Sequence, residues 1–173
     1  MNPSAWITRF GALVPNDGEV LDVACGGGRH TRWFREHGYR VVAVDRDLSG
    51  VDDLRGDPGV ELVECDLEGG VAPPFAGRTF AAVVVTNYLW RSILDDLARA
   101  AAPGGWLLYE TFAAGNERFG RPTNPEFLLQ PGELLALARA HGLRVVAYED
   151  LAVDEPRPAA IQRLAAVREP PTL

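Results

Sequence analysis

The chain contains no lysine, and its 17 basic residues are all arginine. Without a lysine amine no side chain can form a Schiff base with a carbonyl substrate, and an oxidoreductase mechanism built on a Tyr-x-x-x-Lys pair is excluded as well. Cysteine is scarce too: Cys25 and Cys65 are the only two. We expect them to be small buried thiols, because their spacing indicates neither a disulfide nor a metal site, and no other group of metal ligands is visible.

Long apolar runs are also missing. No stretch of 18 apolar residues occurs, so we expect no membrane span. The first residues, Met-Asn-Pro-Ser-Ala-Trp, lack the charged and apolar regions of a signal peptide. With 173 residues, of which 47% are hydrophobic, the chain can build the core of one domain. A cytoplasmic single-domain protein is expected, and the sequence does not indicate its oligomeric state.

A positive charge balance is absent, since the formal net charge is −7 at pH 7. Proteins that bind nucleic acids usually carry a basic surface, because neutralising phosphates supplies much of their affinity. A small-molecule partner is therefore favoured over a nucleic acid, although a local basic patch stays compatible with this composition.

What the chain does contain is a glycine turn after a short apolar run. Residues 20–31 read Val-Leu-Asp-Val-Ala-Cys-Gly-Gly-Gly-Arg-His-Thr, which predicts a strand, a tight turn and the start of a helix. In the dinucleotide fingerprint G-x-G-x-x-G a third glycine would stand where this chain has Thr31. Asp22, just before the turn, would repel a pyrophosphate but suits a cation. The turn therefore indicates a nucleoside ligand without phosphates.

The segment Asp22–Gly28 resembles the first motif of class I S-adenosylmethionine (SAM)-dependent methyltransferases, D-x-[GA]-x-G-x-G. Pro103-Gly104-Gly105 before an apolar run is a second feature of that family. Residues 44–47, 86–89 and 109–112 are most similar to small bacterial enzymes of the tellurite-resistance and thiopurine-methyltransferase-like type. The resemblance extends over residues 18–168, and it implies SAM as the cofactor and S-adenosylhomocysteine (SAH) as its product.

Strand and helix patterns alternate along the chain. Apolar runs predict strands at 20–23, 39–45, 60–67, 80–89, 106–112, 143–148 and 161–168, and helices are expected at 30–37, 95–102 and 130–141, the second ended by the Pro-Gly-Gly. The alternating pattern of 161–168 favours an edge strand, whereas the family places an antiparallel last strand beside the fifth. The expected fold is a single α/β domain at 18–173, with a seven-stranded, mostly parallel, doubly wound sheet and an antiparallel last strand. A helix or cap precedes it at 1–17.

Several residues near strand ends are expected to bind the cofactor. Asp45 lies 17 residues after Gly28, near the offset of an acid that accepts from ribose hydroxyls. By resemblance, Asp66 would accept from the adenine amino group and the Leu67 N–H would face the ring, although each acid could be an ordinary turn residue. His30, like Arg29, could contact the cofactor carboxylate. The predicted set is Asp22, Ala24, Cys25, Gly26, Gly28, His30, Asp45, Arg46, Asp66, Leu67 and Asn87.

The substrate side is less defined. The irregular segment 112–130 leaves the cofactor edge of the sheet, where its arginines could hold an anion or form a solvated connector. An N-terminal helix with Trp6, Phe10 and Leu13 at helical spacing could cover the cofactor cleft or pack on the sheet edge. The predicted substrate residues are Trp6, Tyr88, Arg91, Arg118 and Arg121. As a general base the sequence offers only Tyr88 and Glu110.

Methyl transfer from a sulfonium is an in-line displacement, for which a protein supplies binding, alignment and exclusion of water. The lack of a compelling base favours a small acceptor that is already nucleophilic, such as a thiol, a selenol or a metalloid. Three alternatives remain: an RNA- or protein-directed methyltransferase, a catalytically silent SAM-binding partner subunit and, least favoured, an NAD-dependent oxidoreductase.

Overall fold

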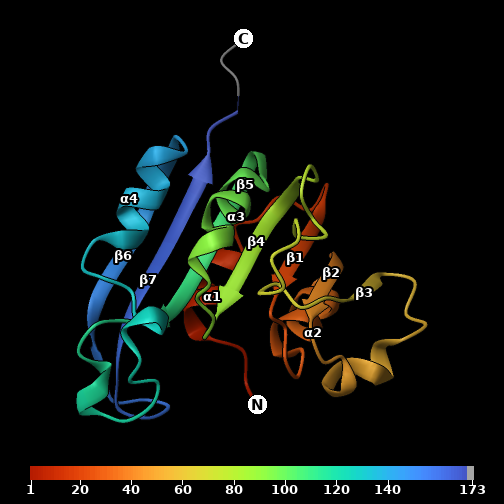
Figure 1. The fold of residues 1–173 in the computed structure, drawn as a ribbon. Coiled ribbons are helices and arrows are strands. Elements are labelled where there is room, and N and C mark those ends of the chain that lie inside the picture. The colour runs from red at the N-terminus through yellow and green to blue at the C-terminus, as the bar shows by residue number, and fades with distance from the viewer. Residues whose placement is uncertain (171–173) are drawn as a thin grey trace.

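Seven strands form one twisted sheet in the order β3-β2-β1-β4-β5-β7-β6 (Figure 1). The structure is a computed structural model and describes residues 1–170. The strands are β1 (Glu19–Val23), β2 (Arg40–Asp45), β3 (Val60–Glu64), β4 (Phe80–Thr86), β5 (Ala101–Phe112), β6 (Leu143–Val153) and β7 (Ala159–Arg168). The helices are α1 (Ala5–Gly11), α2 (Arg29–Glu36), α3 (Leu94–Arg99) and α4 (Glu133–Ala140), with 3₁₀ turns η1 (Ser49–Leu54), η2 (Arg91–Ile93), η3 (Asn116–Arg118) and η4 (Pro125–Phe127).

The first five strands are parallel to one another, as the apolar runs predicted. β1 pairs with β2 and β4, and β4 pairs with β5. Residues 80–85 of β4 are all buried, which confirms it as a central strand covered on both faces. The carboxyl ends of β1, β2, β3 and β4 therefore lie along one edge of the sheet, where ligands bind in open α/β folds.

The far end of the sheet is antiparallel. β7 lies between β5 and β6 and runs antiparallel to both, which confirms the expected place of the last strand beside the fifth. The prediction that 161–168 is an edge strand is wrong, because β6 takes the edge. The polar residues behind that prediction have partners around the strand: Gln162 accepts a hydrogen bond from the Leu134 N–H of α4 and donates to the Gln130 carbonyl in the loop before that helix. Arg163 is paired with Glu110 and Glu149.

The Pro-Gly-Gly segment has a different role from the one predicted. α3 ends at Arg99, not at 102, and Ala101 already pairs with Phe80 in the sheet. The pairing then jumps to Ala82 with Trp106, so residues 103–105 form an irregularity inside β5. A Cβ on Gly105 would lie 2.6 Å from the Phe80 carbonyl oxygen, which explains why glycine is needed for this close approach.

Helices cover both faces of the sheet. Trp6 and Phe10 of α1 pack with Phe34 of α2 and Trp106 of β5 on one face, and Leu97 of α3 and Leu134 of α4 belong to the core of the other. Leu13, expected on the apolar stripe of the N-terminal helix, lies beyond its end and is 58% exposed. The fold is thus the predicted single, doubly wound α/β domain. No helix within residues 1–170 combines the length and apolar character needed to cross a bilayer.

Candidate functional site

The turn between β1 and α2 uses left-handed backbone conformations. Ala24, Gly26 and Gly28 have φ angles of 52°, 53° and 71°. The Gly28 N–H donates to the Cys25 carbonyl at 2.8 Å, which closes the turn. A Cβ on Gly28 would lie 2.4 Å from Cγ1 of Val51 in η1, so this position excludes any side chain. The N–H groups of Cys25 and Gly26 are bonded as well, to the Val44 carbonyl and to Oδ2 of Asp45, so hydrogen bonds fix the turn at the carboxyl end of β1.

Asp22 supports this turn from below. Its Oδ2 accepts hydrogen bonds from the Thr31 N–H at 2.9 Å and from the Thr31 hydroxyl at 2.6 Å. Thr31, which replaces the third glycine of the dinucleotide fingerprint, is thus the partner of this carboxylate. Burial raises the pKa of Asp22 to about 6, against the opposing effect of the Thr31 hydrogen bonds. Asp22 was predicted to bind the cofactor, but it is 2% exposed and its side chain lines neither cavity described below.

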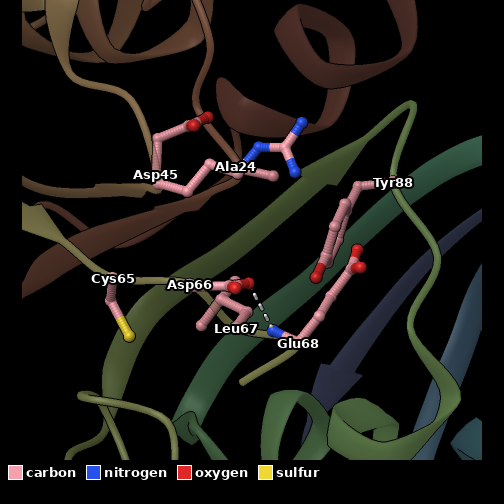
Figure 2. Close-up of a pocket in the computed structure, with 8 residues that line it drawn as sticks. Ala24, Asp45, Cys65, Asp66, Leu67, Glu68 and Tyr88 are labelled. Atoms are coloured by element: carbon pink, nitrogen blue, oxygen red, sulfur yellow. Dashed lines mark hydrogen bonds between the residues drawn. The ribbon is translucent and has the colours of Figure 1, made fainter.

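A first cavity of about 310 Å³ lies beside the turn (Figure 2). Figure 2 shows the Tyr88 ring pointing toward Glu68 on one side of the cavity. Asp45 lies on the opposite side. The cavity is lined by predicted residues from the ends of four strands and by two that sequence reasoning missed, Cys65 and Glu68. The full lining is Ala24, Asp45, Arg46, Cys65, Asp66, Leu67, Glu68 and Tyr88.

Hydrogen bonds hold the two predicted acids of this cavity in place. Oδ2 of Asp45 accepts from the Gly26 N–H at 2.8 Å, and Oδ1 accepts from the Asp47 N–H at 3.0 Å. Oδ1 of Asp66 accepts from the Glu68 N–H at 2.9 Å, the dashed line in Figure 2. This hydrogen bond forms a turn that brings Glu68 to the cavity. Because Asp side chains often bond to the backbone N–H two residues ahead, the position of Asp66 in the sequence could have predicted the turn.

A second cavity of about 380 Å³ lies on the other side of the turn and shares Ala24 with the first. Three predicted residues, Cys25, Gly26 and Asn87, contribute to it, and Asn87 is held at a φ of 53°. The other lining residues are Met1, Gly27, Arg29, Arg32 and Thr86. The glycine turn thus separates two adjoining spaces at the carboxyl edge of the sheet.

The two spaces differ in charge. The first is lined by the carboxylates of Asp45, Asp66 and Glu68 and by the single guanidinium of Arg46. The second contains Arg29 and Arg32 and no carboxylate. Arg32 forms a bidentate pair with Asp53, which leaves Arg29 as the less neutralised cation of that cavity. The site therefore offers a negative pocket and a positive pocket on either side of the turn.

His30 faces away from these cavities. It is 2% exposed, and its Nε2 accepts a hydrogen bond from the Ser4 N–H at 3.0 Å. Burial, aided by the charge of Arg29, lowers the pKa of His30 to about 3, so the ring is neutral at pH 7. Its predicted contact with a cofactor carboxylate has no support in this geometry, because Arg29 and not His30 lines the second cavity.

The two predicted bases lack the properties of a base. Burial and the neighbouring Glu68 raise the pKa of the Tyr88 phenol, so the hydroxyl stays protonated at neutral pH and is not available as a base. The Glu110 carboxylate accepts from the Ser4 hydroxyl at 2.8 Å and from Arg163 at 3.2 Å. Both of these donors lie within the protein, and the Glu110 carboxylate lines neither cavity.

The predicted substrate residues do not form one cluster. Trp6 is buried in the core, where its Nε1 donates to the Leu164 carbonyl and the Arg163 guanidinium lies 4.9 Å from its ring centre. Arg91 donates to Glu133 and to the carbonyls of Glu126 and Leu128, so it anchors the long loop rather than a ligand.

The other two substrate candidates, Arg118 and Arg121, lie exposed on the loop after β5. Beside this loop runs the hairpin between β6 and β7, as Figure 1 shows. From that hairpin Arg157, which sequence reasoning missed, donates to the Arg121 carbonyl at 3.4 Å. Buried Asn116 joins the two segments by donating to the Pro122 carbonyl and accepting from the Ala160 N–H.

Comparison with known proteins decides the family. Residues 20–105 match the family described as "Methyltransferase domain". The chain belongs to this family, the class I methyltransferases. The family match ends just before Trp106, so it includes the glycine turn, all three acids of the first cavity and the carboxyl end of β4.

Solved methyltransferases share the fold. TehB from Haemophilus influenzae superposes with a TM-score of 0.73 at 16% identity, covering 95% of this chain and 61% of TehB. The glycopeptide N-methyltransferase MtfA complexed with SAH gives a TM-score of 0.65 at 18% identity, covering 97% of this chain and 90% of MtfA. At these identities the likeness concerns the fold.

Among curated proteins, the methyltransferase domain is similar to the malonyl-[acyl-carrier protein] O-methyltransferase of Serratia marcescens. The two are 33% identical over 113 residues, which cover 62% of this chain and 43% of that enzyme. The chain spans between 39% and 56% of the length of the curated relatives it matches. Within residues 1–170, no three His, Cys, Asp or Glu side chains are grouped closely enough to hold a metal ion.

Proposed function

We propose that the protein is a SAM-dependent methyltransferase that transfers the methyl group to a small nucleophile. The observation that carries this proposal is the pair of oppositely charged cavities that meet at Ala24, on either side of the glycine turn. An adenosyl ligand with a sulfonium, an amino group and a carboxylate matches such a division. A dinucleotide does not, because its pyrophosphate would face the acids of the first cavity.

The residues present fit this cofactor at both ends. In the first cavity Asp45 would accept from the ribose hydroxyls and Asp66 from the adenine amino group, with Leu67 against the ring. In the second, Arg29 would bind the carboxylate of the amino-acid end, beside the glycine turn. When bound, SAM supplies an activated methyl group on a positively charged sulfur.

The protein's own contribution is placement and electrostatics. The carboxylates of the first cavity would stabilise the positive charge of bound SAM, and they would attract the uncharged sulfur of SAH less strongly. Asn87 and Tyr88 follow β4 at the edge shared by both cavities, where they would border the acceptor. Because Tyr88 stays protonated, it can orient an acceptor by donating a hydrogen bond.

A soft acceptor fits a site without a base. A thiolate, a selenolate or a metalloid oxyanion carries its own lone pair and needs alignment rather than deprotonation. Arg118 and Arg121, with Arg157 beside them, would attract such an anion toward the carboxyl edge of the sheet. A protein-bound acceptor is the second candidate. It is favoured by the Serratia marcescens relative, which is named for an acyl-carrier protein, and by the exposure of the same arginines.

The test is an acceptor screen that measures SAH release with SAM and panels of thiols, selenols, metalloid oxyanions, phenols, amines, malonyl-carrier protein and transfer RNA. The proposal expects turnover with at least one small soft acceptor. A variant with Arg118 and Arg121 both replaced by glutamine should lose turnover of anionic acceptors while keeping SAH affinity. Turnover confined to RNA, an amine or the carrier protein would contradict a small soft nucleophile as substrate.

A further inference from the structure

The first four residues form a strap that leads from the second cavity to α1. Met1 is among the residues that line it, beside the glycine turn and Asn87. The carbonyl of Asn2 accepts a hydrogen bond from Nη1 of Arg29 at 3.2 Å. The strap then passes into α1, whose apolar face is held in the core by Trp6 and Phe10. One end of the strap is therefore fixed, while the other borders the ligand space.

Ser4 holds the strap at its junction with α1. Its N–H donates to the neutral ring of His30 at 3.0 Å, and its hydroxyl donates to the Glu110 carboxylate at 2.8 Å. The same hydroxyl oxygen accepts from the Trp6 N–H at 3.2 Å, which caps α1. Ser4 thus joins three elements: its backbone N–H bonds to the start of α2, and its side chain bonds to the carboxyl end of β5 and to the first turn of α1.

The partners of Ser4 are themselves held rigidly. Glu110 is only 15% exposed at its side chain and is also paired with Arg163, which in turn pairs with Glu149 of β6. His30 is buried and comes directly after Arg29, the residue that both lines the cavity and binds the Asn2 carbonyl. A displacement of Ser4 would consequently move the strap and the environment of Arg29 together.

We propose that Ser4 is a positioning residue that holds residues 1–3 as a wall of the second cavity and so sets the affinity for the amino-acid end of the cofactor. The inference rests on the proposed function, since it assigns that end of SAM to this cavity. It also gives the Glu110 carboxylate a role: it anchors the strap rather than accepting a proton from the substrate.

The test compares two ligands that differ only at the end the strap encloses. SAH carries the amino-acid end, and 5′-methylthioadenosine has the same adenosyl thioether without it. Ser4→Ala should raise the Kd for SAH about tenfold, in line with the loss of a hydrogen bond to a charged group, and should change the Kd for methylthioadenosine less than about twofold. Thr8→Ala is the matched control, because its hydroxyl bonds only to the Ala5 carbonyl within α1. It should affect neither Kd.

The outcomes separate this inference from the function on which it rests. If the unaltered protein binds neither ligand, the proposed function fails. If it binds both and Ser4→Ala weakens both equally, or weakens neither, the positioning role is wrong. Hydrogen exchange of the unaltered protein tests the same role of the strap without a variant. SAH should slow amide exchange in residues 2–5, and methylthioadenosine should not; equal protection by the two ligands would overturn the inference.

Discussion

The Asp45 carboxylate accepts a hydrogen bond from the Gly26 amide over 2.8 Å and so joins the end of β2 to the glycine turn after β1. This contact places an acid of the first cavity against the backbone that separates the two cavities. A side chain expected to bind ribose thus also fixes the turn that would face the rest of the cofactor. Removing it should affect the ligand twice, through a lost acceptor and through a looser turn.

Asp45→Ala is therefore expected to weaken SAH binding by about 1–3 kcal/mol, the range for a hydrogen bond to a charged group. Calorimetric titration measures the change. Asp47→Ala is the control, because Asp47 lies two residues further along, bonds to the Ser49 N–H and does not line the cavity. The Kd of the Asp47→Ala variant for SAH should stay within about twofold of the value for the unaltered protein. Equal effects of the two variants would mean that the ribose-binding acid has been misassigned.

The neighbouring glycines of the turn should differ sharply in their tolerance of a side chain. Gly28→Ala places a Cβ 2.4 Å from Val51 at a positive φ, and we expect a loss of about 2–4 kcal/mol in the free energy of unfolding. Gly27→Ala meets no atom within 4 Å and should change stability by less than about 1 kcal/mol. Urea unfolding of both variants measures these changes in the free energy of unfolding. Comparable losses would show that the packing of η1 on the turn has been misread.

The two cysteines should react differently with an alkylating reagent. Burial and the charges of Asp22 and Asp45 raise the pKa of Cys25 to about 12, so its thiolate is scarce at pH 8. Cys65 is partly exposed on the wall of the first cavity. Mass spectrometry after iodoacetamide treatment should find the label on Cys65, and saturating SAH should slow its attachment. Labelling of native Cys25 at the same rate, or a Cys65 rate indifferent to bound SAH, would contradict this assignment.

His30 should make the fold sensitive to acid. Its pKa of about 3 in the fold lies below the 6.5 of a free side chain, so the unfolded chain binds the additional proton between these values. The stability that the neutral ring contributes is complete above pH 6.5 and is lost as the pH falls toward 3. His30→Gln keeps an acceptor for the Ser4 N–H and cannot gain this charge.

Between pH 6.5 and 4.5 the unaltered protein should therefore lose about 2 kcal/mol relative to His30→Gln. The raised pKa of Asp22, about 6, acts in the opposite sense, since protonation of that buried carboxyl favours the fold. This second effect is common to both proteins and cancels in the comparison. The free energy of unfolding is measured at several pH values for both proteins. If it changed with pH by the same amount in the two, a buried neutral His30 would be contradicted.

Much of the fold and of the first cavity could be predicted from local sequence. Apolar runs followed by Gly26, Asp45 and Asp66 gave both the strands and the edge at which their ends meet, because parallel strands bring their carboxyl ends together. Glu68 and Cys65 could have been found by extending the same reasoning one or two residues around Asp66.

Other features depended on contacts between distant segments. Nothing local shows that Gln162 bonds to α4 and that Arg163 pairs with carboxylates of β5 and β6. The polar pattern of β7 therefore resembled that of an edge strand. The bulge at Gly105 requires the Phe80 carbonyl of a neighbouring strand. The contacts of Ser4 with His30 and Glu110 join residues 26 and 106 positions apart, which no spacing rule would connect.

Calorimetric titration of the purified protein with SAM, with SAH and, as a control, with NADH shows directly whether the two cavities bind the cofactor. We expect micromolar binding of both adenosyl ligands and no binding of NADH. Binding of NADH, or of neither adenosyl ligand, would contradict the assignment of the two cavities to the ends of this cofactor.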